Sequence, residues 1–449
     1  MKKVIIILSL LCVWDFSFAQ KNADPKLLLQ SGPMVGYSTF MEVKLWVQTK
    51  ESALVHIEYW EKGKPHERKK TSEVQTKKET AYVAHLIADE VTPSKKYDYE
   101  LFINKKAVKL PYELSFQTQT LWQWRTDAPN FKFVVGSCFY VNETEYDRPG
   151  TPYGSNYQIL TEIVKQKPDF MLWMGDNVYL REVDWDSRTG IMRRYTHTRS
   201  FPELQPLLGS VHHYAIWDDH DYGNNDSDRS FWMKETTLEA FKLFWANPNY
   251  RKEGGITGTF QWADVQFFLL DDRYFRTGNE NFVSEERVLF GKDQIDWLLD
   301  GITASKAVFK FIVTGSQVLV PTNNYEELAS YPKEYQYFLS KLRESRVEGI
   351  VFLDGDIHHT EMSKMQENKS YYPFYEFTVS PLTAGVFQRN EVSDNTLLVP
   401  NTVVYENNFA TIDISGVRKN RVLKITVINA NGEVKWTREI NENELKYKK

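Results

Sequence analysis

The chain has 449 residues, of which 42% are hydrophobic and 26% are charged. This length and composition allow one large hydrophobic core and a second, smaller domain. The formal net charge is -5, and lysine and arginine are scattered without a dense basic stripe. Nothing in the charge pattern therefore predicts binding to a nucleic acid, except as a possible substrate.

The N-terminus has the pattern of a secretory signal peptide. Lys2 and Lys3 precede an apolar run from Val4 to Val13, and the small residues Ser17 and Ala19 follow it. The run is too short to span a bilayer, and no other apolar stretch reaches about 18 residues. A buried terminal strand or a lipid anchor at Cys12 fits less well. We expect cleavage after residue 19 and a secreted or periplasmic protein without a membrane span.

The cysteine count excludes an intramolecular disulfide in the mature protein. Removal of the signal peptide takes away Cys12 and leaves Cys138 as the one remaining cysteine. A lone thiol is commonly a small buried hydrophobe. The neighbours of Cys138 in the chain favour another role, described below.

Residues 20 to 125 alternate apolar and polar positions in short runs, as in the segments 41–47 and 54–60. This pattern predicts a small β-sandwich. The segment 91–102 resembles a turn and the following strand of fibronectin type III domains. We expect a fibronectin type III-like domain over residues 20–125, a linker near 117–130, and a second domain over residues 126–449.

From Phe131 onward, apolar strands alternate with helical stretches, which predicts an α/β architecture. The tail returns to simple alternation over 409–414 and 422–428, with a hairpin turn at Asn431-Gly432. The predicted strands cover 131–136, 170–174, 211–217, 265–270, 309–313 and 350–353, and the predicted helices cover 155–166, 231–246 and 292–304.

Five of these strands end in polar residues, at the edge where α/β sheets hold their ligands. One such carboxylate is often only a helix cap or turn residue. A set of them at one edge repels itself, and a multivalent cation is the usual neutraliser. The five segments are Gly136-Ser137-Cys138, Gly175-Asp176-Asn177-Val178-Tyr179, Trp217-Asp218-Asp219-His220-Asp221, Gly315-Ser316-Gln317 and Asp354-Gly355-Asp356-Ile357-His358-His359.

In their order and spacing, these motifs resemble the metallophosphatase domain of the alkaline phosphatase D (PhoD-like) group, related to purple acid phosphatases. The segment from Leu270 to Tyr274 also resembles the Leu-Asp-x-Arg-Tyr segment of that group. The resemblance spans roughly residues 136 to 409. It implies a four-layer αββα fold with a binuclear metal site, and an exported phosphomonoesterase or phosphodiesterase acting on small phosphate esters. The sequence departs from the group at His359-Thr360-Glu361, where serines are common.

The resemblance also implies a ligand set for the first metal. A thiolate, a phenolate and a carboxylate together place much negative charge on one ion, which suits trivalent iron better than zinc or calcium. We therefore expect iron, held by Cys138, Asp176, Tyr179 and His358.

The second metal is expected to have oxygen ligands, which favour calcium, with manganese or magnesium as alternatives. Either Asn224 or Asn225 could join this site, and Asn225 is also a candidate for contacting the substrate. The remaining ligands implied by the resemblance are the shared carboxylate of Asp176, Asp219, Asp356 and the side-chain amide oxygen of Gln317.

The implied chemistry is attack on phosphorus by a hydroxide that the metals generate from water. His220 is expected to orient the phosphate or to protonate the leaving oxygen. Arg273 is a candidate phosphate clamp because its planar guanidinium matches two phosphate oxygens, with a plain salt bridge as the equally weighted alternative.

Two other functions remain open at this point. In one, the chain is a non-catalytic cell-surface binding protein whose metals only stabilise the fold. In the other, it is a nuclease or phospholipase on the same scaffold. The sequence determines neither the physiological substrate nor the oligomeric state.

Overall fold

The computed structural model describes residues 24–281, 286–322, 326–387 and 395–448. The predicted signal peptide lies outside these residues. Within them, no helix combines the length and the apolar character needed to cross a bilayer.

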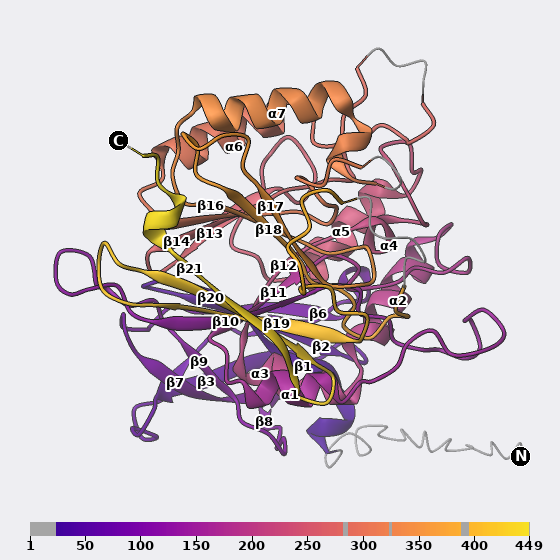
Figure 1. The fold of residues 1–449 in the computed structure, drawn as a ribbon. Helices are drawn as coiled ribbons and strands as arrows, with labels where there is room; N and C mark the ends of the chain where they lie inside the picture. The colour runs from indigo at the N-terminus through magenta and orange to yellow at the C-terminus, as the bar shows by residue number, and fades with distance from the viewer. Residues whose placement is uncertain (1–23, 282–285, 323–325, 388–394, 449) are drawn as a thin grey trace, which may run out of the picture.

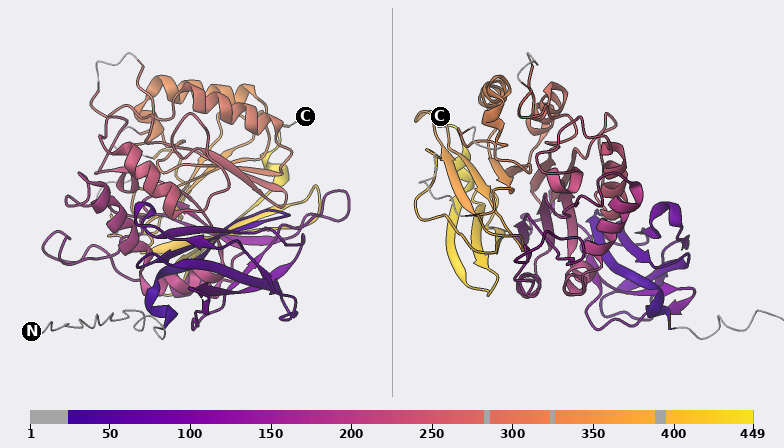
Figure 2. Two further views of the ribbon diagram at one scale, coloured as in Figure 1. Left: turned by 180° about the vertical axis from the view of Figure 1, so that it is seen from behind. Right: turned by 90° about the vertical axis from the view of Figure 1, so that its right-hand side faces the viewer.

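A nine-stranded sheet runs through the molecule (Figure 1), and the N-terminal and C-terminal strands form its two ends (Figure 2, right). Its central strands β10, β11 and β12 are parallel, as expected for buried runs of apolar residues. In spatial order the strands are β21 (Val434–Asn441), β20 (Val422–Asn429), β19 (Asn408–Ser415), β10 (Phe131–Gly136), β11 (Phe170–Met174), β12 (His212–Ile216), β1 (Leu29–Ser38), β2 (Val43–Thr49) and β6 (Val83–Ala88).

A six-stranded sheet faces this one. Its strands β14, β15, β16 and β18 are parallel, and an antiparallel strand closes each edge. In order they are β13 (Gly258–Trp262), β14 (Val265–Leu269), β15 (Phe309–Val313), β16 (Ile350–Asp354), β18 (Phe374–Thr378) and β17 (Glu361–Met365).

Phenylalanine rings fill the space between the two sheets. The ring of Phe267 in β14 lies 5.2 Å from that of Phe133 in β10 and 5.5 Å from that of Phe170 in β11, centroid to centroid. Phe311 in β15 stacks on Phe267 at 5.1 Å. All four side chains are fully buried, so this cluster is the centre of the core.

Helices cover both outer faces, which gives the four-layer αββα arrangement implied by the resemblance. The helices α6 (Lys292–Ala304) and α7 (Pro332–Glu344) lie on the six-stranded sheet, at the top of Figure 1. On the opposite side, α1 (Ile159–Lys165) and α3 (Gln205–Ser210) lie on the nine-stranded sheet. The predicted α/β class is confirmed.

The N-terminal segment forms a β-sandwich that shares a sheet with the rest of the chain. Its strands β1, β2 and β6 pack through a separate apolar core on a third sheet. Val35 of β1 pairs with His212 of β12, so the sandwich continues the nine-stranded sheet (Figure 2, right). The domain boundaries at residues 19 and 125 stay predictions. The third sheet contains β3 (Leu54–Glu61), β4 (Lys69–Lys70), β5 (Val74–Gln75), β7 (Lys96–Ile103), β8 (Lys106–Ala107) and β9 (Ser115–Gln117).

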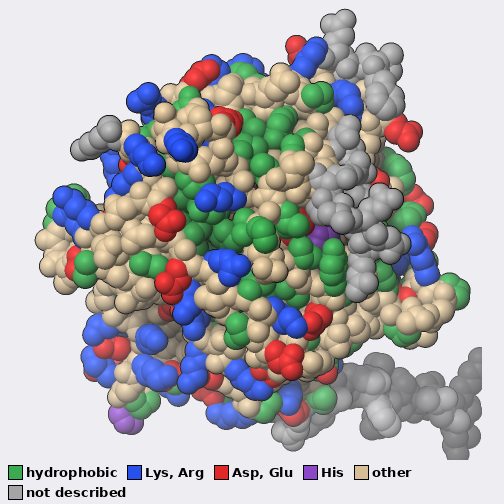
Figure 3. Space-filling model, in the orientation of Figure 1, with side chains coloured by type: hydrophobic (Ala, Val, Ile, Leu, Met, Phe, Trp, Pro, Cys, Tyr) green, Lys and Arg blue, Asp and Glu red, His purple; other side chains and the backbone are tan. Residues whose placement is uncertain are grey.

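The surface of this sandwich carries charges of both signs. Lys and Arg side chains mix with Asp and Glu over the lower part of the molecule, where the N-terminal strands lie (Figure 3). Several form exposed ion pairs, such as Arg68 with Glu58 and Glu100.

The remaining helices gather near the ends of β11 and β12 (Figure 1). They are α2 (Arg188–Arg199), α4 (Asp219–Tyr222) and α5 (Lys234–Phe244), and short 3-10 turns cover Pro25–Leu28, Lys78–Thr80, Pro202–Leu204, Leu328–Ser330 and Glu442–Leu445. The sequence analysis did not predict β13, β17, β18 or α7. The three strands lack a long apolar run, whereas α7 buries Phe338, Leu339 and Leu342 at helical spacing and could have been found from it.

We expect Phe267→Ala to lower the free energy of unfolding by about 3–5 kcal/mol, because it leaves a cavity between the two sheets. Urea denaturation followed by circular dichroism measures the change. The control is Val434→Ala, since Val434 is 60% exposed and its loss should change stability by less than about 0.5 kcal/mol. Equal shifts for the two variants would contradict the assigned core.

Candidate metal centre

Residues that follow β11, β12 and β16 meet at a cavity of about 430 Å³. Its charged lining is acidic, and no lysine or arginine lines it within the described chain. The lining side chains are Tyr153, Asp176, Asp219, His220, Asn225, Asp226, Glu326, Asp356, Ile357, His358 and Phe387.

One cluster at this cavity joins three of the residues expected to bind the first metal. The ligand atoms of Cys138, Asp176 and His358 all lie within 4.8 Å of one another. The Tyr179 hydroxyl is 3.3 Å from His358 Nε2, and Cys138 Sγ accepts a hydrogen bond from the Ser380 hydroxyl at 3.1 Å. The structure thus brings all four predicted ligands of the first metal together.

The imidazole of His358 is held in the orientation that a metal ligand needs. Its Nδ1 lies 2.5 Å from the carbonyl oxygen of Gly385, to which it donates. This contact selects the tautomer in which Nε2 carries a free lone pair. Nε2 faces Tyr179 and the cavity.

A second cluster lies beside the first. The side chains of Asp176, Asp219 and His220 form one group of potential ligands, and those of Asp218, Asp219 and Asp356 form another. The backbone N–H of His220 donates to Asp176 Oδ1 at 3.2 Å and to Asp219 Oδ1 at 2.8 Å. The start of α4 therefore fixes the spacing of the two carboxylates.

Burial and mutual repulsion oppose ionisation of several of these groups. Burial, together with the charge of Asp219, raises the pKa of Asp176 well above its usual value. Burial and the nearby Glu326 raise the pKa of Asp356 to about 8, and burial raises the pKa of the Cys138 thiol to about 12. A multivalent cation reverses each of these effects. The donor set therefore fits bound metal ions.

Four of the candidate ligands have strained backbones. Cys138, Asp176, Asp356 and His358 have φ angles of 59°, 52°, 65° and 57°. Residues other than glycine rarely adopt this left-handed region, and such strain concentrates at functional sites. The chain turns sharply at each strand end, which points these side chains toward a common centre.

Glycines next to the ligands allow the strand ends to approach closely. A Cβ on Gly175 would lie 2.6 Å from the Asp218 Cβ, and one on Gly315 would lie 2.5 Å from its Cγ. A Cβ on Gly355 would lie 2.2 Å from the Ser137 hydroxyl. The glycines in three of the predicted motifs are therefore required by close packing, within the nine-stranded sheet at Gly175 and between the two sheets at Gly315 and Gly355.

The predicted ligand Gln317 is buried behind the cavity. Its Nε2 donates to Glu361 Oε1 at 2.9 Å and to Thr378 Oγ1 at 3.0 Å. Its Oε1 is buried without a hydrogen-bond partner, which is compatible with a ligand oxygen, but Gln317 does not line the cavity. Its role at the second metal stays a prediction. Asn225 lines the cavity, whereas Asn224 lines only the neighbouring pocket.

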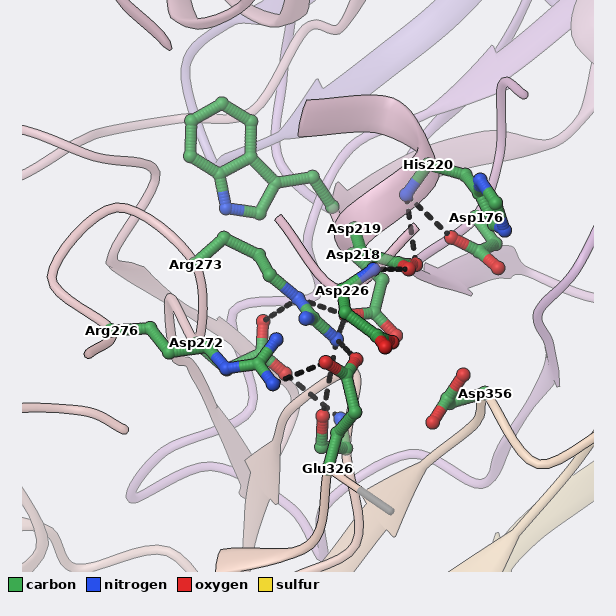
Figure 4. A network of polar contacts seen from close by, with 12 residues as sticks. Asp176, Asp218, Asp219, His220, Asp226, Asp272, Arg273, Arg276, Glu326 and Asp356 are labelled. Atoms are coloured by element: carbon green, nitrogen blue, oxygen red, sulfur yellow. Dashed lines mark hydrogen bonds and ion pairs between the residues drawn. The ribbon is translucent and has the colours of Figure 1, made fainter. Parts of the chain in front are cut away.

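Arg273, the candidate phosphate clamp, is fully buried. Its guanidinium pairs with Asp218 and, at 2.6 Å, with Glu326, which also pairs with Arg276 (Figure 4). Neither arginine lines the cavity. This geometry favours a structural role, in which Arg273 neutralises the carboxylates behind the site.

Three polar residues of the cavity were not among the predicted ligands or substrate contacts. Asp226 and Glu326 form a group of potential ligands with Asp219, and the Tyr153 hydroxyl lies 3.1 Å from His358 Nδ1. Asp226 directly follows the Asn224-Asn225 pair and could have been found from it. Glu326 belongs to a loop without a motif, so no sequence signal marked it.

Comparisons with known proteins agree with this fold. The family model described as PhoD-like phosphatase matches residues 133–443, and a domain of unknown function (DUF7800) matches residues 26–121. A structure titled "Structure of PhoD" shares 16% identity with a TM-score of 0.72, covering 94% of this chain and 93% of that one. Purple acid phosphatase PPD1 from yellow lupin (Lupinus luteus) shares 13% identity with a TM-score of 0.66, covering 91% and 74%. No curated protein matches the sequence.

We expect Arg273→Met to destabilise the fold by about 3–5 kcal/mol, because it leaves Asp218 and Glu326 buried with less compensating charge. Thermal unfolding measures this. The control Arg188→Met removes an exposed pair with Glu239, which is worth about 1 kcal/mol or less. A variant of Arg273 with unchanged melting temperature and a raised KM would instead support the phosphate clamp.

Proposed function

Since the chain belongs to the PhoD-like phosphatase family and is a metal-dependent phosphoesterase, we propose that it is an exported hydrolase of small phosphate esters with iron in its first metal site and calcium in its second. The carrying observation is the convergence of Asp176, Asp219, Asp356 and His358 at one acidic cavity, with the buried thiol of Cys138 within 4.8 Å of the ligand atoms of Asp176 and His358.

The proposal of iron rests on the donor atoms of the first cluster. Cys138 and Tyr179 are 100% and 96% buried, respectively, and lie beside the carboxylate of Asp176. Three anionic donors that are buried together suit a trivalent ion. Calcium and magnesium bind thiolate and phenolate ligands poorly.

The proposal of calcium rests on the second cluster, in which Asp176, Asp219 and Asp356 offer carboxylate oxygens. Oxygen donors favour hard cations, and manganese and magnesium are the alternatives to calcium. Export is proposed from the N-terminal sequence pattern alone.

The residues around the cavity have distinct parts in the reaction. When bound, the metal ions supply Lewis acidity that activates water and offsets charge on the phosphoryl oxygens. Tyr153 and Gly385 hold the His358 imidazole in place. The His220 ring packs on Tyr179 with 4.4 Å between ring centroids and faces the cavity, where it can give a proton to the leaving oxygen.

We expect the metal-replete protein to hydrolyse p-nitrophenyl phosphate or its bis ester. His220→Gln should lower kcat by about 100- to 10,000-fold, because the leaving oxygen loses its proton donor. Colorimetric kinetics give the rates, and elemental analysis gives the metal content of the variant.

The matched control is His66→Gln, since His66 is exposed on the N-terminal sandwich and should affect neither rate nor metal. If His220→Gln loses metal together with activity, His220 is a ligand and not a proton donor. Metal-replete wild-type protein that turns over neither ester would support the alternative of a non-catalytic binding protein.

We expect protein purified without chelators to contain iron and to show a visible charge-transfer band from its phenolate or thiolate ligands. Cys138→Ser should lose iron and activity while keeping the far-ultraviolet circular dichroism of the wild type. Tyr179→Phe should shift or abolish the band. Tyr250→Phe is the control, because the hydroxyl of this core tyrosine has no hydrogen-bond partner. Zinc alone, or unchanged iron in Cys138→Ser, would contradict the assignment.

A further inference from the structure

A second pocket of about 450 Å³ opens beside the metal cavity and shares three lining residues with it, Tyr153, His220 and Asn225. We call it the aromatic annex, because Tyr140, Tyr153, Tyr179 and Trp185 line it. From this arrangement we propose that the annex binds the leaving group of the substrate and selects an uncharged alcohol that carries an aromatic ring, as a nucleoside does. The proposal rests on the proposed function of the neighbouring metal centre.

The position of His220 assigns the annex to the leaving group. A proton donor must lie within hydrogen-bond reach of the leaving oxygen, and in an in-line displacement the leaving group departs on the side opposite to the attacking oxygen. His220 lines both the metal cavity and the annex. An ester oxygen that His220 protonates therefore carries its alcohol toward the annex.

The charges of the two pockets differ in a way that separates their ligands. The metal cavity holds five carboxylates and no lysine or arginine among its described lining residues. The annex has two arginines, Arg148 and Arg181, and two carboxylates, Asp147 and Glu182. Its charges balance in number, so a neutral group meets no net repulsion there, whereas the phosphoryl group belongs with the metals.

The aromatic lining is fixed before any ligand binds. The guanidinium of Arg181 stacks over the Tyr140 ring at 4.2 Å, and both side chains bond to Asp147. The Tyr140 ring lies 4.9 Å from those of Tyr153 and Tyr179. The ordering cost of binding is therefore small, which favours stacking of a flat ring.

Tyr153 is the ring best placed to meet a ligand. It remains 45% exposed although its neighbours Tyr140 and Tyr179 are buried. Its hydroxyl contacts His358, and a Cβ on Gly385 would lie 2.8 Å from its ring. Tyr153 is thus held at the boundary between the two pockets with one side open.

Two substrates that differ only in the base test the proposal: adenosine 5′-(methyl phosphate) and ribose 5-(methyl phosphate). We expect kcat/KM for the release of adenosine to exceed that for ribose by about tenfold or more, the size of effect that stacking of one base produces. Trp185→Leu should reduce this ratio toward one. Trp232→Leu should keep it, because Trp232 is 64% exposed and lies outside the annex.

Calorimetric titration with adenosine itself provides a readout that needs no turnover. Wild-type and Trp232→Leu protein should bind adenosine, and Trp185→Leu should bind at least fivefold more weakly. Equal hydrolysis of the two esters, or equal adenosine binding by all three proteins, would contradict the proposal that the annex binds the leaving group. If adenosine binds as expected but neither ester is cleaved, the annex stands and the proposed hydrolytic function is wrong for such esters.

Discussion

The repulsion among buried anionic groups is the constraint on which the site depends. Asp176, Asp219 and Asp356 lie together where little water reaches them, beside the thiol of Cys138. Such a group cannot ionise fully unless positive charge enters it. Arg273 and Arg276, which are buried and do not line the cavity, supply part of that positive charge. Metal ions bound at the cavity would supply the rest. The fold therefore neutralises only part of the negative charge of the site, and ion binding neutralises the rest.

The fold delivers these groups by ending several strands of two facing sheets at one edge. Left-handed backbone at the ligands turns the chain within one residue, and glycines beside them let the two sheets approach. The phenylalanine cluster packs the two sheets against each other further back along the same strands. Strain at the ligands is thus offset by packing elsewhere, as expected where geometry matters more than local stability.

Much of this arrangement could be predicted from the sequence. Long apolar strands such as 170–174 and 309–313 are readable because they are buried on both faces, and the polar residue after each strand marks the ligand edge. The role of Arg273 could not be predicted. A phosphate clamp must be accessible to the substrate, and the sequence does not show whether a side chain is buried. Glu326 and the annex were not predicted for a related reason. They are formed by loops that are distant in the sequence, and such loops carry no periodic signal. The continuity of the N-terminal sandwich with the main sheet was equally hidden, since alternation predicts strands but not their neighbours.

The continuity of the N-terminal sandwich with the main sheet gives the N-terminal segment a structural role. Strand β1 covers the edge of β12, Trp46 donates from its indole to the Leu243 carbonyl, and a Cβ on Gly36 would collide with Ala246. An open edge is a template for pairing with another chain. The sandwich therefore covers an edge of the main sheet that could otherwise pair with another chain, and it is not a separate domain on a flexible linker. Shortened versions of the enzyme that begin at the predicted linker should expose the edge of β12 and lose solubility before they lose activity.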